Sequence, residues 1–430
     1  MREMKDSGIE IFKKIPYDWK TKRLKYLFSF CKGLPITKEN LIEIGLPVIS
    51  YGQIHSKSNN GVEIQSHLLR YVDFSYQNSY PTSQVFRGDF VFADTSEDYD
   101  GCGNCVYKRD DKVLFAGYHA IIAHSNQKSD NRFLAYLFQT DNWRKQIREK
   151  VSGVKVFSIT QKTLANIYVI LPPPDEQQRI AEFLDGECEK IDGLKADIQA
   201  EIETLEQYKR SVITEAVTHG LDKSAPMKDS GIAWVGFFPS HWTKKKGKYI
   251  LRYLAKPVRQ DDGVITCFRD GEVTLRSNRR EDGFTMADKE IGYQGVDIGD
   301  LVVHGMDGFA GAIGISDSRG KASPVLNVLD TEQNKKYIMY YLRSMAYGNV
   351  FTALSTGIRV RSCDLRWNKL AELLYPLPPI GEQSKIVEYI DRQIARTDEI
   401  IADKKAQIET LEAYKKSVIY EYVTGKKEVN

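Results

Sequence analysis

The chain has 430 residues, of which 42% are hydrophobic and 28% charged, a composition typical of a soluble globular protein too long for one ordinary core. The formal net charge of +3 is nearly balanced, so it neither demands nor excludes a nucleic-acid partner. The chain starts with polar residues, contains no apolar run of membrane-spanning length, and has only six scattered cysteines. We therefore expect two or three domains, no signal peptide, no membrane partner and a reducing, cytoplasmic location.

The chain is a tandem repeat. Its first motif, Met4-Lys-Asp-Ser-Gly-Ile9, recurs as Met227-Lys-Asp-Ser-Gly-Ile232 after a shift of 223 residues. A second segment, Ile202–Thr218, recurs at Ile408–Thr424 after a shift of 206, with thirteen of seventeen positions identical. The two copies thus have alike edges and unlike centres, which indicates two units of one design.

The unlike centres, 19–171 and 242–377, both read as short strands and turns followed by a helix. Short apolar runs such as Asp89-Phe-Val-Phe-Ala93 alternate with Gly, Asn, Asp and Ser clusters. Helical periodicity follows at 131–150 in the first copy and at 336–347 in the second. The pattern predicts two α+β domains.

Each centre ends in a proline-rich stop, Leu171-Pro-Pro-Pro or Leu377-Pro-Pro, before a long helical segment. Asp175 is a candidate N-cap, with Gln178 at the reciprocal capping-box position.

Glycines mark the expected ends and weak points of these helices. Gly220 and Gly425 stand where each helix should stop. Gly186 and Gly193 predict an interruption, with a short helix before a longer one.

An apolar seam with a seven-residue period runs along the first helical segment. It consists of Leu184, Ile191, Ile198, Leu205 and Val212. The equivalent seam in the second segment, Ile390, Thr397, Lys404, Leu411 and Val418, is interrupted by polar residues, and part of its stripe moves to Ile394, Ile401 and Ile408. We expect the two helices to pair with each other, the polar positions fixing their register; the alternative is that each packs on its own domain. About 30 helical residues would span roughly 45 Å, which favours pairing.

The sequence contains no recognisable catalytic motif. It has neither a Walker A loop, nor a glycine-rich cofactor fingerprint after a strand, nor the Asn/Asp-Pro-Pro-aromatic motif of an amino-methyltransferase. Cys102, Cys105, His119 and His124 loosely fit zinc-ligand spacing, but the histidines fall in a strand-like run and have no counterpart in the second copy. We therefore expect no metal site.

Basic stretches occur at similar places in both copies, which makes them candidates for binding DNA phosphates or reading base edges. The alternative is an ordinary solvated surface. The candidate residues are Lys22, Arg23, Lys25, Lys155, Lys244, Lys245, Lys246, Arg276, Asn278, Arg279, Arg280, Arg359 and Arg361.

The repeated edges resemble those of the specificity subunit of type I restriction-modification systems. The resemblance is carried by Leu171-Pro-Pro-Pro-Asp-Glu176-Gln177-Gln-Arg-Ile180, its copy Leu377-Pro-Pro-Ile-Gly-Glu382-Gln383-Ser-Lys-Ile386, and the downstream Leu-Glu-x-Tyr-Lys helices that start at Leu205 and Leu411. It covers the whole chain.

The resemblance implies an α+β fold with two tandem target recognition domains, separated by two long helices packed as an antiparallel, pseudo-two-fold coiled coil. The expected boundaries are 1–172 and 223–378 for the recognition domains, and 173–222 and 379–430 for the spacer helices. Each domain would read half of an asymmetric bipartite site in double-stranded DNA. The helices would dock two methyltransferase subunits, and restriction subunits would join the full complex.

This chain would be non-catalytic and hold no cofactor. S-adenosylmethionine, ATP and Mg²⁺ would be bound by the partner subunits. Two other classes stay open from the residues alone: a scaffold that joins two protein-binding domains, and a self-contained nuclease or methyltransferase.

Overall fold

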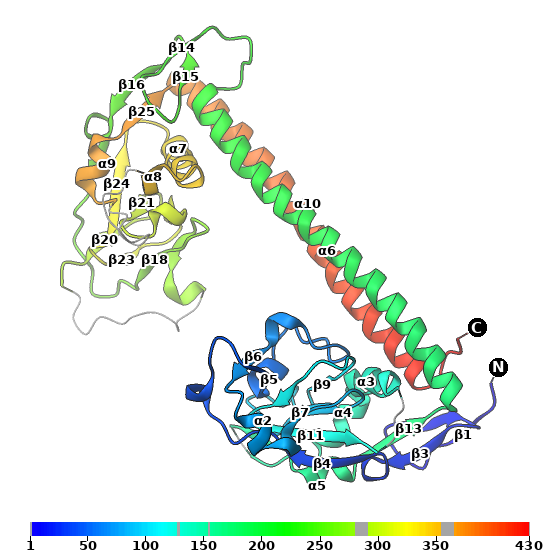
Figure 1. Ribbon diagram of the computed structural model, residues 1–430. Coiled ribbons are helices and arrows are strands. Elements are labelled where there is room, and N and C mark those ends of the chain that lie inside the picture. Colours follow the sequence, from blue (N-terminus) through cyan, green and yellow to red (C-terminus); the bar gives the residue numbers. More distant parts are fainter. Residues whose placement is uncertain (1, 127–129, 154, 280–290, 354–364, 430) are drawn as a thin grey trace. The chain divides into compact units, whose positions relative to one another are not determined.

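The computed structural model of the protein describes residues 2–126, 130–153, 155–279, 291–353 and 365–429 (Figure 1). The chain divides into two compact units. Unit 1 contains Met1–Asp197 and Gln407–Asn430, and unit 2 contains Ile198–Ala406. Each unit therefore combines one α+β domain with a stretch from each of the two long helices.

Unit 1 is built on a four-stranded antiparallel sheet with strand order β4-β11-β7-β9. These strands span Phe28–Lys32, Ala120–Ser125, Phe90–Ala93 and Cys105–Tyr107. Side chains alternate between the two faces of a strand, and both faces of β7 are buried. Phe90 and Phe92 pack against Phe138 and Trp143 of the helices on one face, and Val91 and Ala93 belong to a second core on the other face.

The other elements of unit 1 are short. Its remaining strands are β1 Met4–Asp6, β2 Lys14–Pro16, β3 Lys20–Arg23, β5 Leu46–Ile49, β6 Arg70–Val72, β8 Thr95–Ser96, β10 Phe115–Ala116, β12 Phe157–Ser158 and β13 Tyr168–Leu171. Its helices before the long one are α1 Tyr51–Ile54, α2 Tyr76–Ser79, α3 Arg132–Gln139, α4 Asp141–Arg148 and α5 Gln161–Ala165. The helical segment predicted at 131–150 is thus two helices, because Thr140 adopts an extended conformation and caps α4 by accepting a hydrogen bond from the Trp143 N–H.

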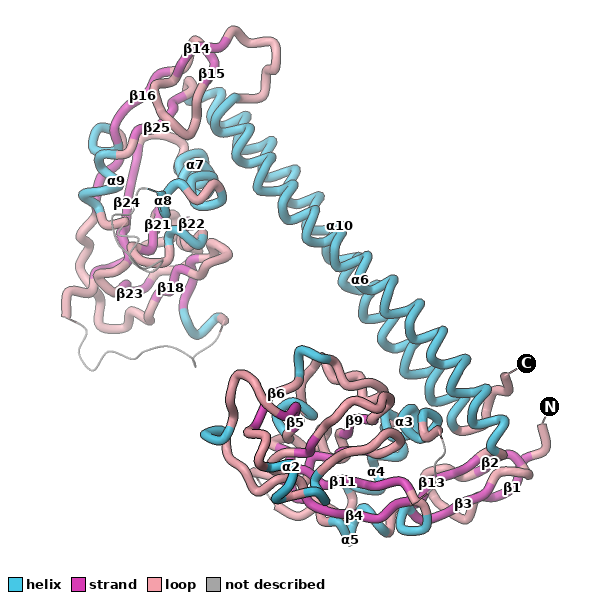
Figure 2. Tube along the Cα trace, viewed as in Figure 1, coloured by secondary structure: helices cyan, strands magenta, loops and turns pink. Residues whose placement is uncertain are grey.

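Unit 2 repeats the central sheet in the same strand order, β17-β24-β21-β22 (Figure 2). These strands span Leu251–Tyr253, Leu326–Thr331, Leu301–His304 and Ile313–Ile315. The other strands are β14 Met227–Asp229, β15 Phe237–Pro239, β16 Thr243–Lys246, β18 Ile265–Cys267, β19 Val273–Leu275, β20 Gln294–Val296, β23 Gly320–Ala322 and β25 Leu374–Leu377. The helices of this domain are α7 Lys335–Tyr347, α8 Val350–Ala353 and α9 Trp367–Glu372.

The two long helices are α6, Pro174–His219, and α10, Ile380–Val423. Both end at the predicted glycines, Gly220 and Gly425, whose φ angles of 77° and 68° are left-handed. The predicted interruption at Gly186 and Gly193 is wrong, because α6 is continuous over 46 residues. A helical glycine costs only about 1 kcal/mol relative to alanine, less than packing of the neighbouring apolar side chains contributes.

The predicted cap at Asp175 is also wrong. The helix begins one residue earlier, at Pro174, because proline suits the first helical position where its missing N–H leaves no bond unmade. Asp175 and Glu176 then lie in the first turn, where a negative charge stabilises the positive end of the helix dipole.

The repeated Glu-Gln motif locks each long helix to the start of its domain. In unit 1, the buried Trp19 indole N–H donates to Glu176 at 3.1 Å. In unit 2, the Trp242 N–H donates to Glu382 at 2.9 Å. The glutamine that follows each glutamate donates to the preceding proline carbonyl, Pro172 or Pro378, at 2.9 Å in both units. We call this Trp–Glu–Gln arrangement the joint.

A second contact fixes each domain to its helix. Tyr136 of α3 donates to Asp185 of α6 at 2.7 Å, and Tyr340 of α7 donates to Asp391 of α10 at 2.5 Å. Burial is the main reason that the pKa of both tyrosines is raised, so both hydroxyls keep their protons and act as donors. The side chains that make these contacts recur in both repeats, which explains why the edges of the two copies are alike.

Candidate nucleic-acid interface

Unit 2 contains a basic cavity of about 600 Å³ beside β18 and β21. Arg269, Arg276 and Arg279 line it. Arg279 lies 4.2 Å from the centroid of the Phe268 ring and pairs with Asp270 at 2.6 Å, while Arg269 pairs with Asp307 at 2.9 Å. The sequence predicted two of these three arginines, and the structure brings them to one cavity.

A histidine adds an uncharged donor to this cavity. His304 Nδ1 accepts hydrogen bonds from the backbone N–H groups of Met306 and Asp307, at 3.2 and 3.0 Å. Two donors on Nδ1 leave the proton on Nε2. Burial lowers the pKa of His304, so the ring is neutral near pH 7 and its Nε2–H remains a hydrogen-bond donor.

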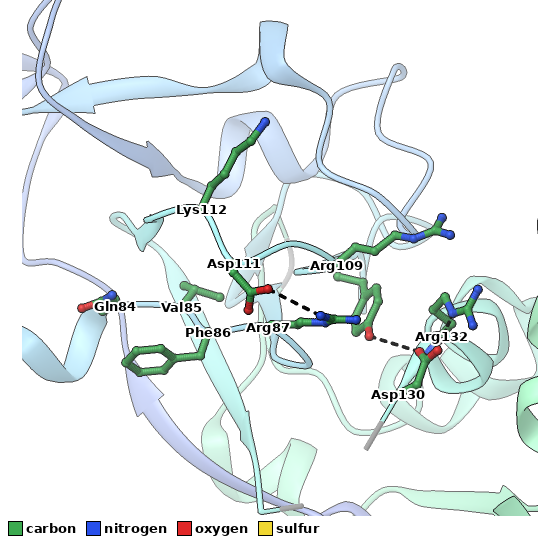
Figure 3. Close-up of a pocket in the computed structure, with 10 residues that line it drawn as sticks. Gln84, Val85, Phe86, Arg87, Arg109, Asp111, Lys112, Asp130 and Arg132 are labelled. Atoms are coloured by element: carbon green, nitrogen blue, oxygen red, sulfur yellow. Dashed lines mark hydrogen bonds and ion pairs between the residues drawn. The ribbon is translucent and has the colours of Figure 1, made fainter. Parts of the chain in front are cut away.

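Unit 1 contains a basic cavity of about 720 Å³, and its lining is different (Figure 3). Four basic residues, Arg87, Arg109, Lys112 and Arg132, face two acidic ones, Asp111 and Asp130. None of these four was predicted from the sequence. One signal could have found Arg87: it stands where the matching Gly-Asp motif of the second copy has Ile298.

One ion pair of this cavity is exposed enough to exchange its partner. Arg87 pairs with Asp111 at 3.4 Å, and both side chains are mostly exposed. Such pairs contribute about 0–1 kcal/mol, so a phosphate or a base edge can replace the carboxylate at small cost. Arg109 and Arg132 share Asp185 of α6, at 3.0 and 2.6 Å, which ties this side of the cavity to the long helix.

The predicted lysines of β3 and β16 lie next to the joints and line neither of these two cavities among the described residues. Arg23 lies over the Tyr168 ring at 5.0 Å and donates to Asn166 at 3.3 Å. Lys22 and Lys245 are exposed. Lys244 donates to the Ser230 carbonyl.

One feature of this region is duplicated. Lys25 lies 5.2 Å from the centroid of the exposed Tyr26 ring, and Lys248 lies 5.5 Å from that of Tyr249. In unit 2, hydrogen bonds from Lys246 and then Lys248 lower the pKa of Glu372 to about 2. A surface that is the same in both repeats suits contacts that do not depend on DNA sequence.

Of the remaining predicted DNA contacts, three belong to the described residues and three do not. Lys155 is exposed, Asn278 donates to Thr274 at 2.9 Å, and Arg276 donates to Thr266 at 3.4 Å. Arg280, Arg359 and Arg361 lie outside the described residues.

The predicted helix seam is buried or half-buried. Leu184, Ile191, Val212, Ile401 and Val418 are buried, and Ile198, Leu205, Ile394, Ile408 and Leu411 are half-buried. Thr397 is buried as well, and its hydroxyl donates within its own helix to the Gln393 carbonyl at 2.8 Å.

Ion pairs show that the helices run antiparallel within each unit (Figure 1). In unit 1, Lys195 pairs with Glu412 and Asp192 with Lys415, at 2.7 and 2.6 Å. In unit 2, Lys209 pairs with Asp398 at 2.5 Å, and Lys404, one of the polar seam residues, pairs with Glu201. Residue numbers fall along α6 as they rise along α10 in both units.

The two cysteines and two histidines whose spacing loosely fits a zinc site have separate environments. Cys102 and Cys105 are buried, His119 contacts Asp94 at 3.1 Å, and His124 contacts Asp89 at 2.7 Å. Across the part of the chain that the structure describes, no group of three or more His, Cys, Asp or Glu residues is arranged to hold a metal ion. None of the described helices is long and apolar enough to span a membrane.

The structure thus has two α+β domains with unlike arginine-lined cavities, and arginine is a common ligand of nucleic-acid phosphates and base edges. Comparison with known proteins gives the family. Residues 16–204 match the type I restriction modification DNA specificity domain. Residues 16–204 thus carry a DNA specificity domain of the type I restriction-modification family, and the relatives that are similar to the chain over most of its length are named type I restriction enzyme specificity subunits.

The similarity to relatives extends over nearly the whole chain. The chain is 24% identical to the type I restriction enzyme MjaX specificity subunit of Methanocaldococcus jannaschii, over 96% of this chain and 94% of the relative. It is 21% identical to the StySPI specificity subunit of Salmonella potsdam, over 90% and 84%. A solved structure from a study of type I restriction-modification complex assembly has a TM-score of 0.65 at 14% identity, covering 96% of this chain and 99% of that one, and shows the same fold.

Proposed function

We propose that each unit reads one half of a bipartite, asymmetric DNA site. The observation that carries this proposal is the contrast between the joints, which repeat side chain for side chain, and the two cavities, which do not. A repeated frame places two readers equivalently, and unlike linings give them unlike donor patterns. Arginine is the side chain that most often recognises guanine, through its O6 and N7 atoms.

Modified-base sequencing tests the proposal. The full chain is expressed with its methyltransferase, and the methylated motif is read from the genome. We expect two different half-sites separated by unread bases. Arg279→Ala should relax one half-site only and Arg87→Ala the other, each weakening binding about 10-fold to 100-fold.

Arg252→Ala is the matched control. Arg252 is an exposed arginine of β17 that pairs with Asp330 and lies outside the unit 2 cavity. This variant should leave both half-sites intact. A symmetric motif, or Arg87→Ala and Arg279→Ala variants that relax the same half-site, would contradict the proposal. DNA binding absent even with the methyltransferase would favour a protein-joining scaffold.

We also propose two equivalent docking surfaces for methyltransferase subunits on the long helices. Among the exposed apolar side chains of these helices, four occupy positions related by the repeat shift of 206. Leu194 corresponds to Ile400, with 52% and 38% exposure, and Tyr208 corresponds to Tyr414, with 49% and 52%. At these repeat-related positions each unit carries one aliphatic and one tyrosine side chain outside the seam, as expected for two copies of one partner.

Substitution of the tyrosines tests this stoichiometry. Tyr414→Asp should reduce the bound methyltransferase from two copies to one, and Tyr208→Asp should remove the other copy, as measured by native mass spectrometry. Glu409→Ala, a change at an exposed polar position of α10, should leave two copies bound. Two copies retained by the Tyr208→Asp, Tyr414→Asp double variant would contradict the proposed surface. In this scheme the methyltransferase subunits bind S-adenosylmethionine, and restriction subunits bind ATP and Mg²⁺.

The helices are further proposed to set the gap between half-sites. Four residues, about one turn, inserted into both helices near Ile198 and Lys404 should lengthen the gap seen in the methylated motif. An unchanged gap would contradict the spacer role.

A further inference from the structure

Three residues of unit 1 that are far apart in the sequence meet on neighbouring strands. Cys31 lies on β4 and His124 on β11, and Asp89 immediately precedes β7. These strands are adjacent in the sheet, with β11 between the other two (Figure 1). Cys31 is paired with Ile122, two residues before His124 on the same strand, so Cys31 and His124 are diagonal neighbours on one face.

The three side chains form a linear Cys–His–Asp arrangement. Cys31 Sγ lies 3.2 Å from His124 Nε2, and His124 Nδ1 lies 2.7 Å from Asp89 Oδ2. The buried Asp89 carboxylate also accepts hydrogen bonds from the backbone N–H groups of Phe86 and Ser125, at 2.8 and 2.9 Å, which fix its position. This is the geometry in which a histidine, oriented by a third group, activates a nucleophile.

The histidine is positively charged near neutral pH. Hydrogen bonds to Asp89 and then to Cys31 raise the pKa of His124 to about 10, although burial acts in the opposite direction. A neighbouring imidazolium stabilises a thiolate, which is the reactive form of cysteine. The Thr82 carbonyl, 3.1 Å from Sγ and 3.4 Å from Nε2, can accept a hydrogen bond from either group.

The other described cysteines have the opposite environment. Cys102, Cys105, Cys188 and Cys267 are buried, and burial is the first cause of the raised pKa of each thiol, to about 12 for Cys105 and Cys267 and about 11 for Cys188. Cys31 is partly exposed. Phe86, which is 53% exposed and lies 5.9 Å from the His124 ring, connects the cluster to the rim of the unit 1 cavity.

We propose that Cys31 is a reactive thiol and a site of reversible S-thiolation by low-molecular-weight disulfides. The Cys31 thiolate attacks one sulfur of the disulfide, a new S–S bond forms as the old one breaks, and the second sulfur leaves as a thiolate that takes a proton from solvent. His124 is a positioning residue that holds the Cys31 proton, and Asp89 orients the ring. The geometry selects this cysteine over its buried counterparts.

Alkylation of the full chain by iodoacetamide at pH 7, followed peptide by peptide with mass spectrometry, tests the reactivity. An ordinary thiol is only a few per cent ionised at this pH, so we expect the Cys31 peptide to react about 10-fold faster in the folded protein than in guanidinium-unfolded chain. Peptides with Cys102, Cys105, Cys188 and Cys267 should react more slowly when folded. A Cys31 rate in the folded protein no higher than in the unfolded chain would overturn the proposal without any variant.

His124→Gln should abolish the rate advantage, and His67→Gln is the matched control, because His67 is an exposed unit 1 histidine that contacts Ser58. Oxidised glutathione should give a mixed disulfide on the Cys31 peptide that dithiothreitol removes, and Cys31→Ser should give none there. A folded His124→Gln protein that keeps the fast rate, or glutathionylation confined to other peptides, would contradict the assignment. These readouts do not depend on DNA binding.

Discussion

The two units of this protein differ in their cavities and agree in their joints. In both, a buried tryptophan donates to the first glutamate of a long helix. A tyrosine of the domain donates to an aspartate further along the same helix. Around the cavities, unit 1 gathers Arg87 and Lys112, whereas unit 2 gathers Arg279 and the neutral His304. The joints therefore repeat while the cavity linings differ, and in unit 1 Asp185 of the long helix contacts both the domain tyrosine and two of the cavity arginines.

The largest expected effect comes from breaking a joint. Trp19→Ala or Trp242→Ala removes a side chain with 0% exposure and leaves a glutamate without its indole donor. Each should destabilise its own unit by about 3–5 kcal/mol. Hydrogen exchange with peptide resolution should show the loss in unit 1 for the first variant and in unit 2 for the second.

Trp19→Phe keeps an aromatic ring at this position and loses the indole N–H. It should therefore lower the stability of unit 1 less than Trp19→Ala does. Equal loss of protection in both units from one single variant would show that the joints are not independent.

A smaller expected effect is a difference between the two units in how their stability depends on pH. In unit 2, hydrogen bonds from Lys256 and Arg319 lower the pKa of Asp297 to about 2, and hydrogen bonds from Lys335 and then Arg252 lower the pKa of Asp330 to about 2. The unfolded value is near 4, so this stabilisation is present above about pH 4 and is lost as the pH falls toward 2. In unit 1, the pKa of His124 is raised, so the dependence on pH has the opposite sign. The stabilisation of the folded state by His124 is fully present below about pH 6.5 and is lost as the pH rises through about 10.

We therefore expect acid to weaken unit 2 more and alkali to weaken unit 1 more, as measured by exchange corrected for intrinsic rates. Because Asp297 is 41% exposed, its share should be at most about 1 kcal/mol. Asp297→Asn should reduce the acid sensitivity of unit 2, and an unchanged profile in that variant would rule out this cause.

The smallest effects should come from the ion pairs between the helices. Lys195–Glu412 in unit 1 and Lys209–Asp398 in unit 2 join α6 to α10 at exposed or half-exposed positions. Double-mutant cycles to alanine should give coupling energies of about 0–1 kcal/mol in each unit, which fall as salt is added. A coupling above 2 kcal/mol in either unit would mean that these pairs, and not the apolar seam, hold the helices together.

The sequence by itself determined the parts of this protein that rest on local or periodic patterns. The duplication follows from direct identity, the ends of α6 and α10 follow from Gly220 and Gly425, and the α+β centres follow from short alternating runs before an amphipathic helix. The seam followed from a period of seven. These signals are readable because each is contained in a short stretch of chain.

Only the tertiary structure decided the rest. Helix α6 continues through Gly186 and Gly193 because burial of neighbours such as Leu184 and Ile191 outweighs the local preference of glycine. The unit 1 cavity assembles residues from 84 to 132, and the Cys–His–Asp cluster joins strands whose residues are tens of positions apart. Strand order sets those meetings, and strand order depends on long-range pairing that no local pattern records.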